Sequence, residues 1–577
     1  MTNSSPIEKV VPSQGHSSMY VMHKFFGRKQ ERLIQEYIKH YTHDSGEIVL
    51  DPFCGSGVTI GEALHLGRKA IGIDINPVSI FVTRNTLRYI SHMRIVKEFR
   101  AIEADVKNDI SNLYSTNCPK CGNIIPATCF SWQDSKLFDR RYVCPQDGKK
   151  VEKVQSFDRD RYNEIQNHSI DSFFNSKGLL NYWFPENPLY YSGGKAFLKK
   201  ERYDNIDDLY TYRNLIALAK LLDRIKKICE SDLRESFLFA FSSLVHLASK
   251  MTPVRPSRPF SSSWIQPSYW YCPHYMESNV WQLFERAVMG KQGLYRAKKD
   301  LKLKIKHIKE VNSIEELHEA TLPSFFLINS NITQLELIPQ NSVDFIITDP
   351  PYGHSIQYGE LLYLWGAWIN ILEGYDDILR NEIIANSRQN KDLAIYEQLL
   401  RQAFHKIYSI LKREKYCTVT FHNPSLSIRN ILYRSVIQTG FLFERVVYHP
   451  PARASAKSLF QPEGSQQGDY FFIFKKPLKE EKRIYRPITS EELEEWIIDI
   501  VKNILIAEGK PLPYNQLQNQ LDPFLYKKLY ESNLLLTFNP NEVKKTMMKF
   551  IGTEFSVIDN TYKESPYEKL WWISNDS

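Results

Sequence analysis

The sequence has no apolar run long enough to cross a membrane, and residues 1–5 lack the basic and apolar segments of a secretory signal. It has only 8 cysteines in 577 residues, and their spacing shows no regular disulfide framework. A chain of this length can bury a large enough core to fold without disulfides. There is also no internal repeat and no low-complexity tract. These absences lead us to expect a cytoplasmic protein without a membrane partner.

The composition is that of an ordinary globular protein, with 42% hydrophobic and 24% charged residues, and the length suits two to four domains. The net charge is +8 and the pI is about 8.7. A basic balance of this size fits a polyanionic partner such as nucleic acid, although many basic proteins bind none. The charge therefore permits such a partner without requiring one.

A glycine-rich loop, Asp-Pro-Phe-Cys-Gly-Ser-Gly at residues 51–57, follows the apolar run at residues 48–50. Glycine lets the backbone approach a cofactor closely, and residues 59–66 are predicted to form the helix that follows the loop. A second predicted strand, residues 71–73, ends in Asp74, about twenty residues beyond the loop. In a doubly wound α/β fold, an acid at this position holds the ribose of a nucleotide cofactor.

A second loop, Thr-Asp-Pro-Pro-Tyr-Gly at residues 348–353, follows the strand-like run at residues 343–347. Each proline fixes φ and removes a backbone N–H, which leaves a stiff loop with carbonyls able to accept hydrogen bonds. A planar amino group fits this loop, with the Asp349 carboxylate and the Pro350 carbonyl as acceptors. The ring of Tyr352 would stack on the ring that carries the amino group.

Three stretches together resemble the S-adenosylmethionine-dependent DNA amino-methyltransferases, which modify adenine N6 or cytosine N4: the loop at 51–57, Gly-Ile-Asp-Ile-Asn-Pro at 72–77, and Asp-Pro-Pro-Tyr at 349–352. The resemblance implies an α/β, Rossmann-like methyltransferase domain with S-adenosylmethionine as cofactor. It implies double-stranded DNA as substrate, with the target base flipped out of the stack. It assigns the cofactor site to Asp51, Phe53, Gly55, Ser56, Gly57, Asp74 and Asn76, and the catalytic loop to Asp349, Pro350, Pro351 and Tyr352.

The sequence departs from this family in two ways. In many relatives the Asp-Pro-Pro-Tyr loop comes first, whereas here the cofactor loop precedes it. Relatives usually carry an acid for the cofactor adenine in the strand before the catalytic loop, and this chain has Ser330 and Asn331 there. The first departure leaves the site unchanged, whereas the second puts the adenine contact in doubt.

Adenine N6 in DNA is the expected target. Cytosine-C5 methylation is disfavoured because it needs a thiolate nucleophile, typically on a Pro-Cys loop, and the sequence has no Pro-Cys dipeptide. Cytosine N4 is one alternative, although Ser would be more usual at position 349. An RNA guanine-N2 methyltransferase is another, although such relatives carry a sizeable RNA-binding domain before the first strand. The third is a non-catalytic DNA-binding partner that kept the fold, against which the intact motifs argue.

An insertion separates the two halves of the methyltransferase domain, which we expect at residues 16–106 and 325–476. Its first part, residues 107–155, is zinc-ribbon-like, with Cys118, Cys121, Cys144 and Asp147 at the spacing of two metal-binding knuckles. Asp147 stands where the second knuckle would have a cysteine, and Cys129 is an alternative ligand. A bound zinc ion is therefore predicted, and a ribbon that has lost its metal is the competing interpretation.

The second part of the insertion, residues 156–324, is predicted to be helical over 208–229 and 232–250. It resembles the insertion of the larger bacterial zinc-ribbon-containing DNA methylases, which implies target recognition. Arg255 and Arg258 lie in a proline-rich, aromatic stretch, and Lys298 and Lys299 lie in the basic run at 291–309. We predict DNA contacts for these four, although basic runs are often simply solvated faces.

The remaining residues, 486–577, are expected to form a small accessory domain that is winged-helix-like. Its role cannot be inferred from the residues. The family resemblance also allows a restriction or defence-system partner.

Overall fold

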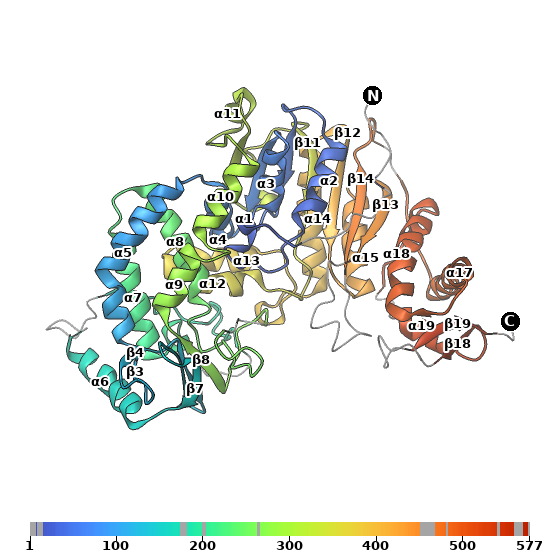
Figure 1. Ribbon diagram of the computed structural model, residues 1–577. Helices are drawn as coiled ribbons and strands as arrows, with labels where there is room; N and C mark the ends of the chain where they lie inside the picture. Colours follow the sequence, from blue (N-terminus) through green and yellow to red (C-terminus); the bar gives the residue numbers. More distant parts are fainter. Residues whose placement is uncertain are drawn as a thin grey trace.

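The computed structural model describes residues 7, 15–172, 182–198, 203–261, 263, 266–450, 468–480, 483–538, 543–558 and 569–574, with side chains described to residue 166 in the first long stretch. Figure 1 shows a central sheet with the insertion to its left and the C-terminal helices to its right. None of the helices in these ranges has the length and apolar character needed to span a membrane.

The central sheet has eight strands in the order β13-β14-β12-β11-β1-β2-β10-β9. β1 pairs in parallel with both β2 and β11, whereas β14 is antiparallel to β12 and β13. The carboxyl ends of β1, β2 and β11 therefore meet at one edge, the usual place for a site in a parallel sheet. The strands are β1 (Ile48–Asp51), β2 (Lys69–Asp74), β9 (Lys309–Val311), β10 (Ser324–Asn329), β11 (Val343–Thr348), β12 (Leu411–Phe421), β13 (Leu442–His449) and β14 (Asp469–Lys475).

Helices cover both faces of this sheet. On one face lie α2 (Glu31–Tyr41), α3 (Val58–His65) and α10 (Leu294–Lys304), which share a buried cluster with Val49 and Ile347. On the other lie α14 (Leu393–Ile410) and α15 (Leu426–Ile437), which share a cluster with Leu50 and Ile346. Consecutive strand residues thus point to opposite faces, and the near-continuous apolar runs of these strands follow because both faces are buried.

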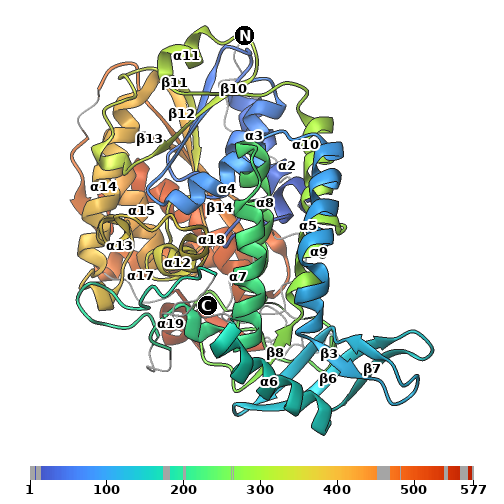
Figure 2. The same cartoon turned by 90° about the vertical axis from the view of Figure 1, so that its left-hand side faces the viewer.

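The insertion is one body rather than a ribbon followed by helices. Its helix α5 (His92–Asn112) runs without a break through the boundary expected at residues 106–107. It packs against α7 (Tyr212–Lys226) and α9 (Val280–Met289), and α8 (Ser231–Val245) packs against both of these helices, as Figure 2 shows. Helix α12 (Tyr358–Ile369), which follows the second loop, packs against α8 and buries Trp365 and Trp368. The insertion therefore shares a core with the element next to the catalytic loop.

The small strands of the insertion form a hairpin and a four-stranded sheet, β7-β6-β5-β8. Strand β8 (His274–Ser278) pairs with β5 from beyond the helices, so the ribbon region does not end at residue 155. The main sheet also resumes with β9, before the expected boundary at residue 325. The sequence did not predict this strand, because its three residues, Lys-Glu-Val, contain no apolar run. The other strands are β3 (Ser115–Asn117), β4 (Ile124–Pro126), β5 (Cys129–Gln133), β6 (Lys136–Cys144) and β7 (Gly148–Lys153).

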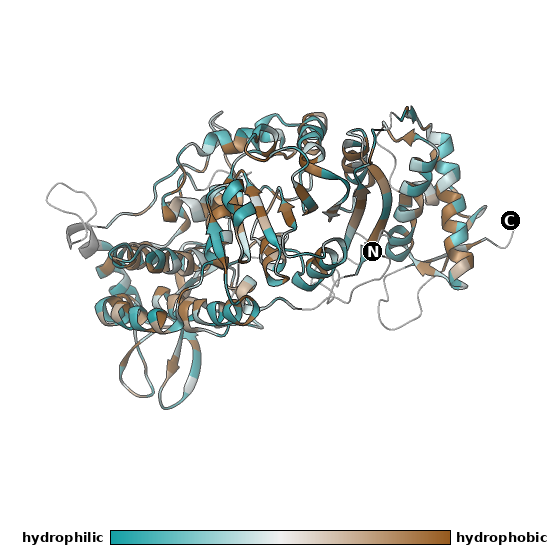
Figure 3. Cartoon of the chain, turned by 90° about the horizontal axis from the view of Figure 1, so that it is seen from above, coloured by the Kyte–Doolittle hydropathy of each residue, from teal (hydrophilic) through white to brown (hydrophobic). Residues whose placement is uncertain are grey.

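The C-terminal region contains α17 (Ser490–Glu508), α18 (Tyr514–Glu531), α19 (Val543–Lys549) and a small sheet of β16 (Leu512–Pro513), β19 (Leu570–Ile573) and β18 (Phe555–Ile558). Helix α18 packs against β13, and Leu521 and Leu525 belong to the same buried cluster as Leu432 and Phe474 of the main domain. Figure 3 shows these helices beside the last strands of the sheet. The region is therefore joined to the sheet by a continuous core.

Candidate functional site

The glycine-rich loop turns sharply between β1 and α3. Gly55 and Gly57 have φ of 50° and 78°, the left-handed region that glycine adopts without strain. A Cβ on Gly57 would lie 2.5 Å from the side chain of Thr83, and one on Gly55 would lie 3.0 Å from the ring of Phe25. Both glycines are thus required by conformation and by close packing around the loop.

Asp74 anchors this loop from the end of β2. One carboxylate oxygen accepts from the backbone N–H of Gly55 (3.0 Å), and the other accepts from that of Asn76 (2.8 Å). Burial raises the pKa of Asp74 to about 6, against these hydrogen bonds. Asn76 caps α4 (Pro77–Leu87) by accepting from the N–H of Val78, and it donates to the hydroxyl of Tyr375 (2.7 Å). Asp74 therefore shapes the loop as well as facing the cavity.

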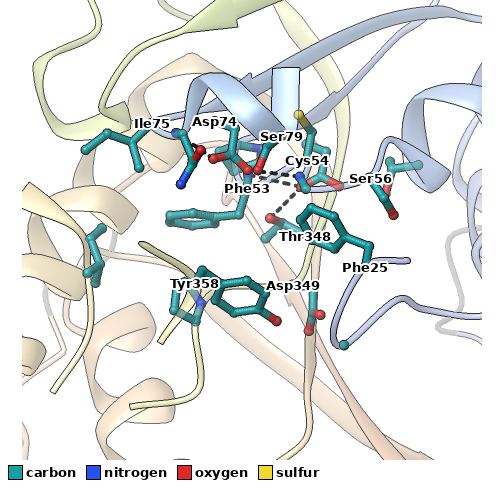
Figure 4. Close-up of a pocket in the computed structure, with 18 of the residues that line it drawn as sticks. Phe25, Phe53, Cys54, Ser56, Asp74, Ile75, Ser79, Thr348, Asp349 and Tyr358 are labelled. Atoms are coloured by element: carbon teal, nitrogen blue, oxygen red, sulfur yellow. Dashed lines mark hydrogen bonds between the residues drawn. The ribbon is translucent and has the colours of Figure 1, made fainter. Parts of the chain in front are cut away.

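One cavity joins the two loops that the sequence singled out. Figure 4 shows Asp74 on one side of it, Asp349 on another, and Phe53 and Tyr358 between them. The predicted residues that line it are Asp51, Phe53, Gly55, Ser56, Asp74, Asn76, Asp349 and Pro351, whereas Gly57, Pro350 and Tyr352 lie behind the surface. Residues nearly 300 positions apart are brought together because β1 and β11 are neighbours in the sheet.

Asp51, at the end of β1, links the two loops through hydrogen bonds. Its carboxylate accepts from the hydroxyl of Thr348 (2.8 Å) and from the N–H of Phe53 (3.1 Å). Burial raises the pKa of Asp51 to about 7, against these hydrogen bonds. The ends of β1 and β11 are thus tied by a direct side-chain contact.

Asp349 lies at the mouth of the second loop with its side chain 19% exposed. Its Oδ1 accepts from the hydroxyl of Thr420 (2.8 Å), and its Oδ2 accepts from the hydroxyl of Tyr352. Burial raises the pKa of Asp349 to about 6, while the nearby Lys29 ammonium lowers it. The carboxylate is therefore held in one orientation by two hydroxyl donors.

Tyr352 is only 2% exposed, and its ring packs edge-on against Phe421 at 5.3 Å. The ammonium of Lys29 lies 5.1 Å from the centre of the same ring. The side-chain amide of Asn423 donates to the Tyr352 carbonyl (3.1 Å) and fixes the loop backbone. The expected stacking of a base on this ring therefore requires Lys29 to move.

The segment before α2, residues 23–29, forms a strap over the cofactor loop. Arg28 donates to the hydroxyl of Ser56 (3.2 Å) and to the carbonyl of His23 (2.6 Å). The ring of Phe25 lies on Gly55. Lys29, the last residue of this strap to line the cavity, reaches Asp349. A basic run beside a glycine and two phenylalanines was the available signal, but it does not say which cation points inward.

At the far end of the cavity, Ser330 and Asn331 line the wall where relatives have an acid. The Asn331 side chain is occupied in capping, because it accepts from the N–H of Thr333 (3.0 Å). Glu382 also lines the cavity; its Oε1 accepts from the N–H of Gly359 (2.9 Å), and its buried Oε2 has no hydrogen-bond partner within the described residues. Burial raises the pKa of Glu382 to about 7. No motif or spacing in the sequence singles out this acid.

Three of the four predicted zinc ligands come together. The thiols of Cys118, Cys121 and Cys144 lie within 4.8 Å of one another, between the turn after β3 and the end of β6. Asp147 is not in this group; its side chain is 41% exposed and pairs with Lys150 at 2.6 Å. Cys129 is buried in β5, outside the cluster. The structure therefore does not bring Asp147 to the three thiols, because its carboxylate pairs with Lys150.

The four predicted DNA contacts differ in accessibility. Arg258 and Lys299 are exposed, and Arg255 is half-buried. Lys298 is 2% exposed, and its ammonium donates to the carbonyls of Asn85 and, at 2.7 Å, Arg88, at the end of α4. Burial lowers the pKa of Lys298 to about 7. The prediction for Lys298 was wrong, because this lysine satisfies helix-end carbonyls inside the protein.

A family model matches the part of the chain that carries the glycine-rich loop. Residues 3–82 match a family model described as DNA methylase, of the N6 and N4 type. A 67-residue stretch is 31% identical to the Type II methyltransferase M.MjaII of Methanocaldococcus jannaschii, covering 12% of each chain. The match thus spans about an eighth of that relative's length.

Solved structures match the chain at low similarity, and two of them serve as examples. One is TTHA0409 of Thermus thermophilus, named as a putative DNA modification methylase and solved with S-adenosyl-L-methionine (13% identity, 33% of this chain and 59% of that one, TM-score 0.15). The other is the rRNA methyltransferase aviRa of Streptomyces viridochromogenes (9% identity, 79% and 91%, TM-score 0.25). Scores this low add nothing to the functional argument. From its motifs and its family match, the chain resembles the S-adenosylmethionine-dependent DNA amino-methyltransferases.

Proposed function

We propose that this protein is a site-specific DNA methyltransferase that transfers a methyl group from S-adenosylmethionine to the N6 amino group of adenine. The observation that carries the proposal is the single cavity that places Asp349 opposite the glycine-rich loop and Asp74. Two loops that face each other across one cavity can hold a cofactor and a second reactant close together.

The residues that line the cavity suit the chemistry of S-adenosylmethionine. Gly55 and Gly57 open the loop, Asp74 offers a carboxylate for ribose hydroxyls, and Ile75 and Ile332 supply apolar walls for a purine ring. The buried, unpartnered oxygen of Glu382 is a candidate acceptor for a cofactor N–H or O–H group, in place of the acid missing at Ser330 and Asn331. When bound, the cofactor supplies an electrophilic methyl group on a sulfonium.

The residues of the second loop would prepare the amino group for attack. The Asp349 carboxylate and the Pro350 carbonyl accept its two N–H bonds, which directs the nitrogen lone pair toward the cavity. Tyr352 holds the base ring once it has been flipped out of the duplex. Thr420 and Asn423 fix the carboxylate and the loop backbone, so that positioning provides most of the acceleration. No general base is needed in this scheme, because the surplus proton leaves after the N–C bond forms.

The remaining predictions are proposals of the same kind. Arg255, Arg258 and Lys299 are the accessible candidates for phosphate contact. Cys118, Cys121 and Cys144 would hold a zinc ion, with Asp147 completing the tetrahedron only after it leaves Lys150. The C-terminal order, three helices that alternate with short strands and then two final strands, supports a winged-helix-like region. Cytoplasmic location and a restriction or defence-system partner complete the proposal.

The test is transfer of labelled methyl from S-adenosylmethionine to unmethylated genomic DNA, with bulk RNA alongside, followed by nucleoside analysis. The variant is Asp349→Ala, and the matched control is Asp377→Ala, whose side chain is 75% exposed on α13 (Tyr375–Asn381). We expect N6-methyladenine with the wild type and the control but not with Asp349→Ala. N4-methylcytosine would keep the enzyme class and change the base. Label in RNA alone, or none anywhere while the cofactor binds, would contradict the proposal.

A further inference from the structure

Lys29 is a buried lysine held by the catalytic loop. Its Nζ lies 2.7 Å from Oδ1 of Asp469 and 3.3 Å from Oδ1 of Asp349, and its side chain is 8% exposed. Burial works against the charge of Lys29, but the two carboxylates outweigh it and raise the pKa of the ammonium. A cation this deeply buried persists only with such partners.

These contacts fall where the proposed reaction needs the target base. The base requires the Asp349 carboxylate for its amino group and the face of Tyr352 for its ring. In the structure, the Lys29 ammonium lies beside that carboxylate and over that ring, 5.1 Å from the ring centre. The hydroxyls of Thr420 and Tyr352 donate to the same carboxylate. A base that enters therefore competes with Lys29 for both of its partners.

Asp469 is a second carboxylate partner for the Lys29 ammonium. It is the first residue of β14, and it is the closer of the two carboxylates to Lys29. On its other side, Nδ1 of His422 lies 3.3 Å from the same oxygen. Burial would raise the pKa of Asp469, yet Lys29 and His422 hold it well below its ordinary value. Lys29 can thus leave Asp349 without losing a charged partner.

We propose that Lys29 is a positioning residue that occupies the target-base site of the free enzyme. When the base enters, Lys29 leaves Asp349 and keeps its contact with Asp469. The inference rests on the proposed function and adds one step to it. In the free enzyme the Asp349 carboxylate is paired with Lys29, and the target amino group replaces Lys29 when the base binds. Because Arg28, the neighbouring residue, holds Ser56 of the cofactor loop, the same strap lies against both halves of the cavity.

Removal of Lys29 should also change the protonation of Asp349. Burial raises the pKa of Asp349 to about 6 while Lys29 lowers it, so the pKa should rise further without the lysine. The acidic limb of kcat/KM should then move to higher pH, because the carboxylate is the form that accepts the amino group. The charged and titratable groups around Asp349 are Lys29, Asp469, Tyr352, Asp51 and Tyr358, with His422 behind Asp469.

The experiment uses the full-length enzyme with S-adenosylhomocysteine and a duplex that carries 2-aminopurine next to the mapped target adenine. The adenine keeps its 6-amino group, and the fluorescence of the neighbouring 2-aminopurine rises when the adenine leaves the stack. Lys29→Met should increase the fluorescence severalfold, and Asp469→Asn should decrease it, because the lysine then has Asp349 as its one remaining carboxylate. Lys39→Met, at an exposed lysine of α2, removes the same charge and should change nothing. The acidic limb of kcat/KM should rise by about one pH unit in Lys29→Met and stay near wild type in Lys29→Arg.

A merely structural role for Lys29 would move both variants in the same direction, and that result would overturn the inference. So would a Lys29→Met enzyme with wild-type fluorescence and pH profile. If Lys29→Met fails to bind the cofactor, Asp469→Asn decides alone, and unchanged or increased fluorescence refutes the proposal. A wild type that methylates no DNA refutes the proposed function itself, whereas an active wild type with indifferent variants refutes only the role of Lys29.

Discussion

The ion pair between Arg429 of α15 and Asp522 of α18 joins the C-terminal helices to the methyltransferase sheet, and its loss should be costly. Both side chains are fully buried. Nε of Arg429 lies 2.6 Å from Oδ2 of Asp522, and Nη2 of Arg429 donates a hydrogen bond to Oδ1 of Asp522 (3.2 Å). Arg429 also donates to the carbonyl of Asn423 (2.8 Å), the residue that holds the backbone of Tyr352. The pair thus reaches the catalytic loop through a single residue.

The change we propose is Asp522→Asn, which keeps the volume and removes the charge. Breaking one side of a buried pair typically costs about 3–5 kcal/mol, because the remaining charge has no counter-ion. Arg429 keeps the Asn423 carbonyl, so we expect the lower end, about 3 kcal/mol of unfolding free energy. Methyl transfer should fall more than cofactor binding does, since Asn423 supports Tyr352 and not the glycine-rich loop.

Urea denaturation of the wild type and the variant measures this loss. The matched control is Glu531→Gln on the same helix, whose partner Lys527 lies 3.8 Å away with both side chains more than 60% exposed. Exposed pairs of this kind contribute little, so the control should unfold with the wild type. If Asp522→Asn were no less stable than Glu531→Gln, the argument that this pair ties the two regions together would be wrong.

Three other variants each probe a single contact. Gly57→Ala should abolish cofactor binding in a calorimetric titration, because the alanine Cβ would lie 2.5 Å from Thr83 at a φ of 78°; retained affinity would contradict the role of the glycine-rich loop in binding the cofactor. Cys144→Ser should release zinc from the purified protein in metal analysis, while Cys229→Ser, at an exposed thiol outside the cluster, should not; equal metal content in both would exclude the site. Lys298→Met should lower the melting temperature with little change in DNA affinity, and Lys299→Ala should do the reverse in a salt-dependent binding assay; the opposite pattern would contradict the buried position of Lys298.

The sequence predicts the parts of the molecule whose signal is local. The two loops follow apolar runs that form β1 and β11, and the glycines of the first loop are required by their own backbone angles. Their meeting at one cavity could be anticipated only through the family resemblance, since nothing local says that two strands nearly 300 residues apart are neighbours. The short strands β8 and β9 were not predicted, because their pairing partners lie far away in the chain.

The errors at single residues have a similar origin. In α10 the buried positions are Leu294, Ala297, Lys298 and Leu301, at helical spacing, so periodicity could have placed this lysine on the inner face. The prediction used only the basic composition of residues 291–309 and therefore placed the whole run on the surface. For Lys29, in contrast, no local pattern could have predicted the direction of the side chain. Its ammonium is held by Asp469, which lies 440 residues later in the chain.

The most direct test of the central claim is the separation of cofactor binding from methyl transfer in Asp349→Ala. Asp349 faces the cavity from the second loop and makes no contact with the glycine-rich loop among the described hydrogen bonds, so the dissociation constant for S-adenosylmethionine should stay near wild type. The rate of methyl transfer to DNA should fall by about a hundredfold or more, since the carboxylate acts on the amino group. Loss of both together, or of neither, would contradict the proposal that Asp349 holds the target amino group.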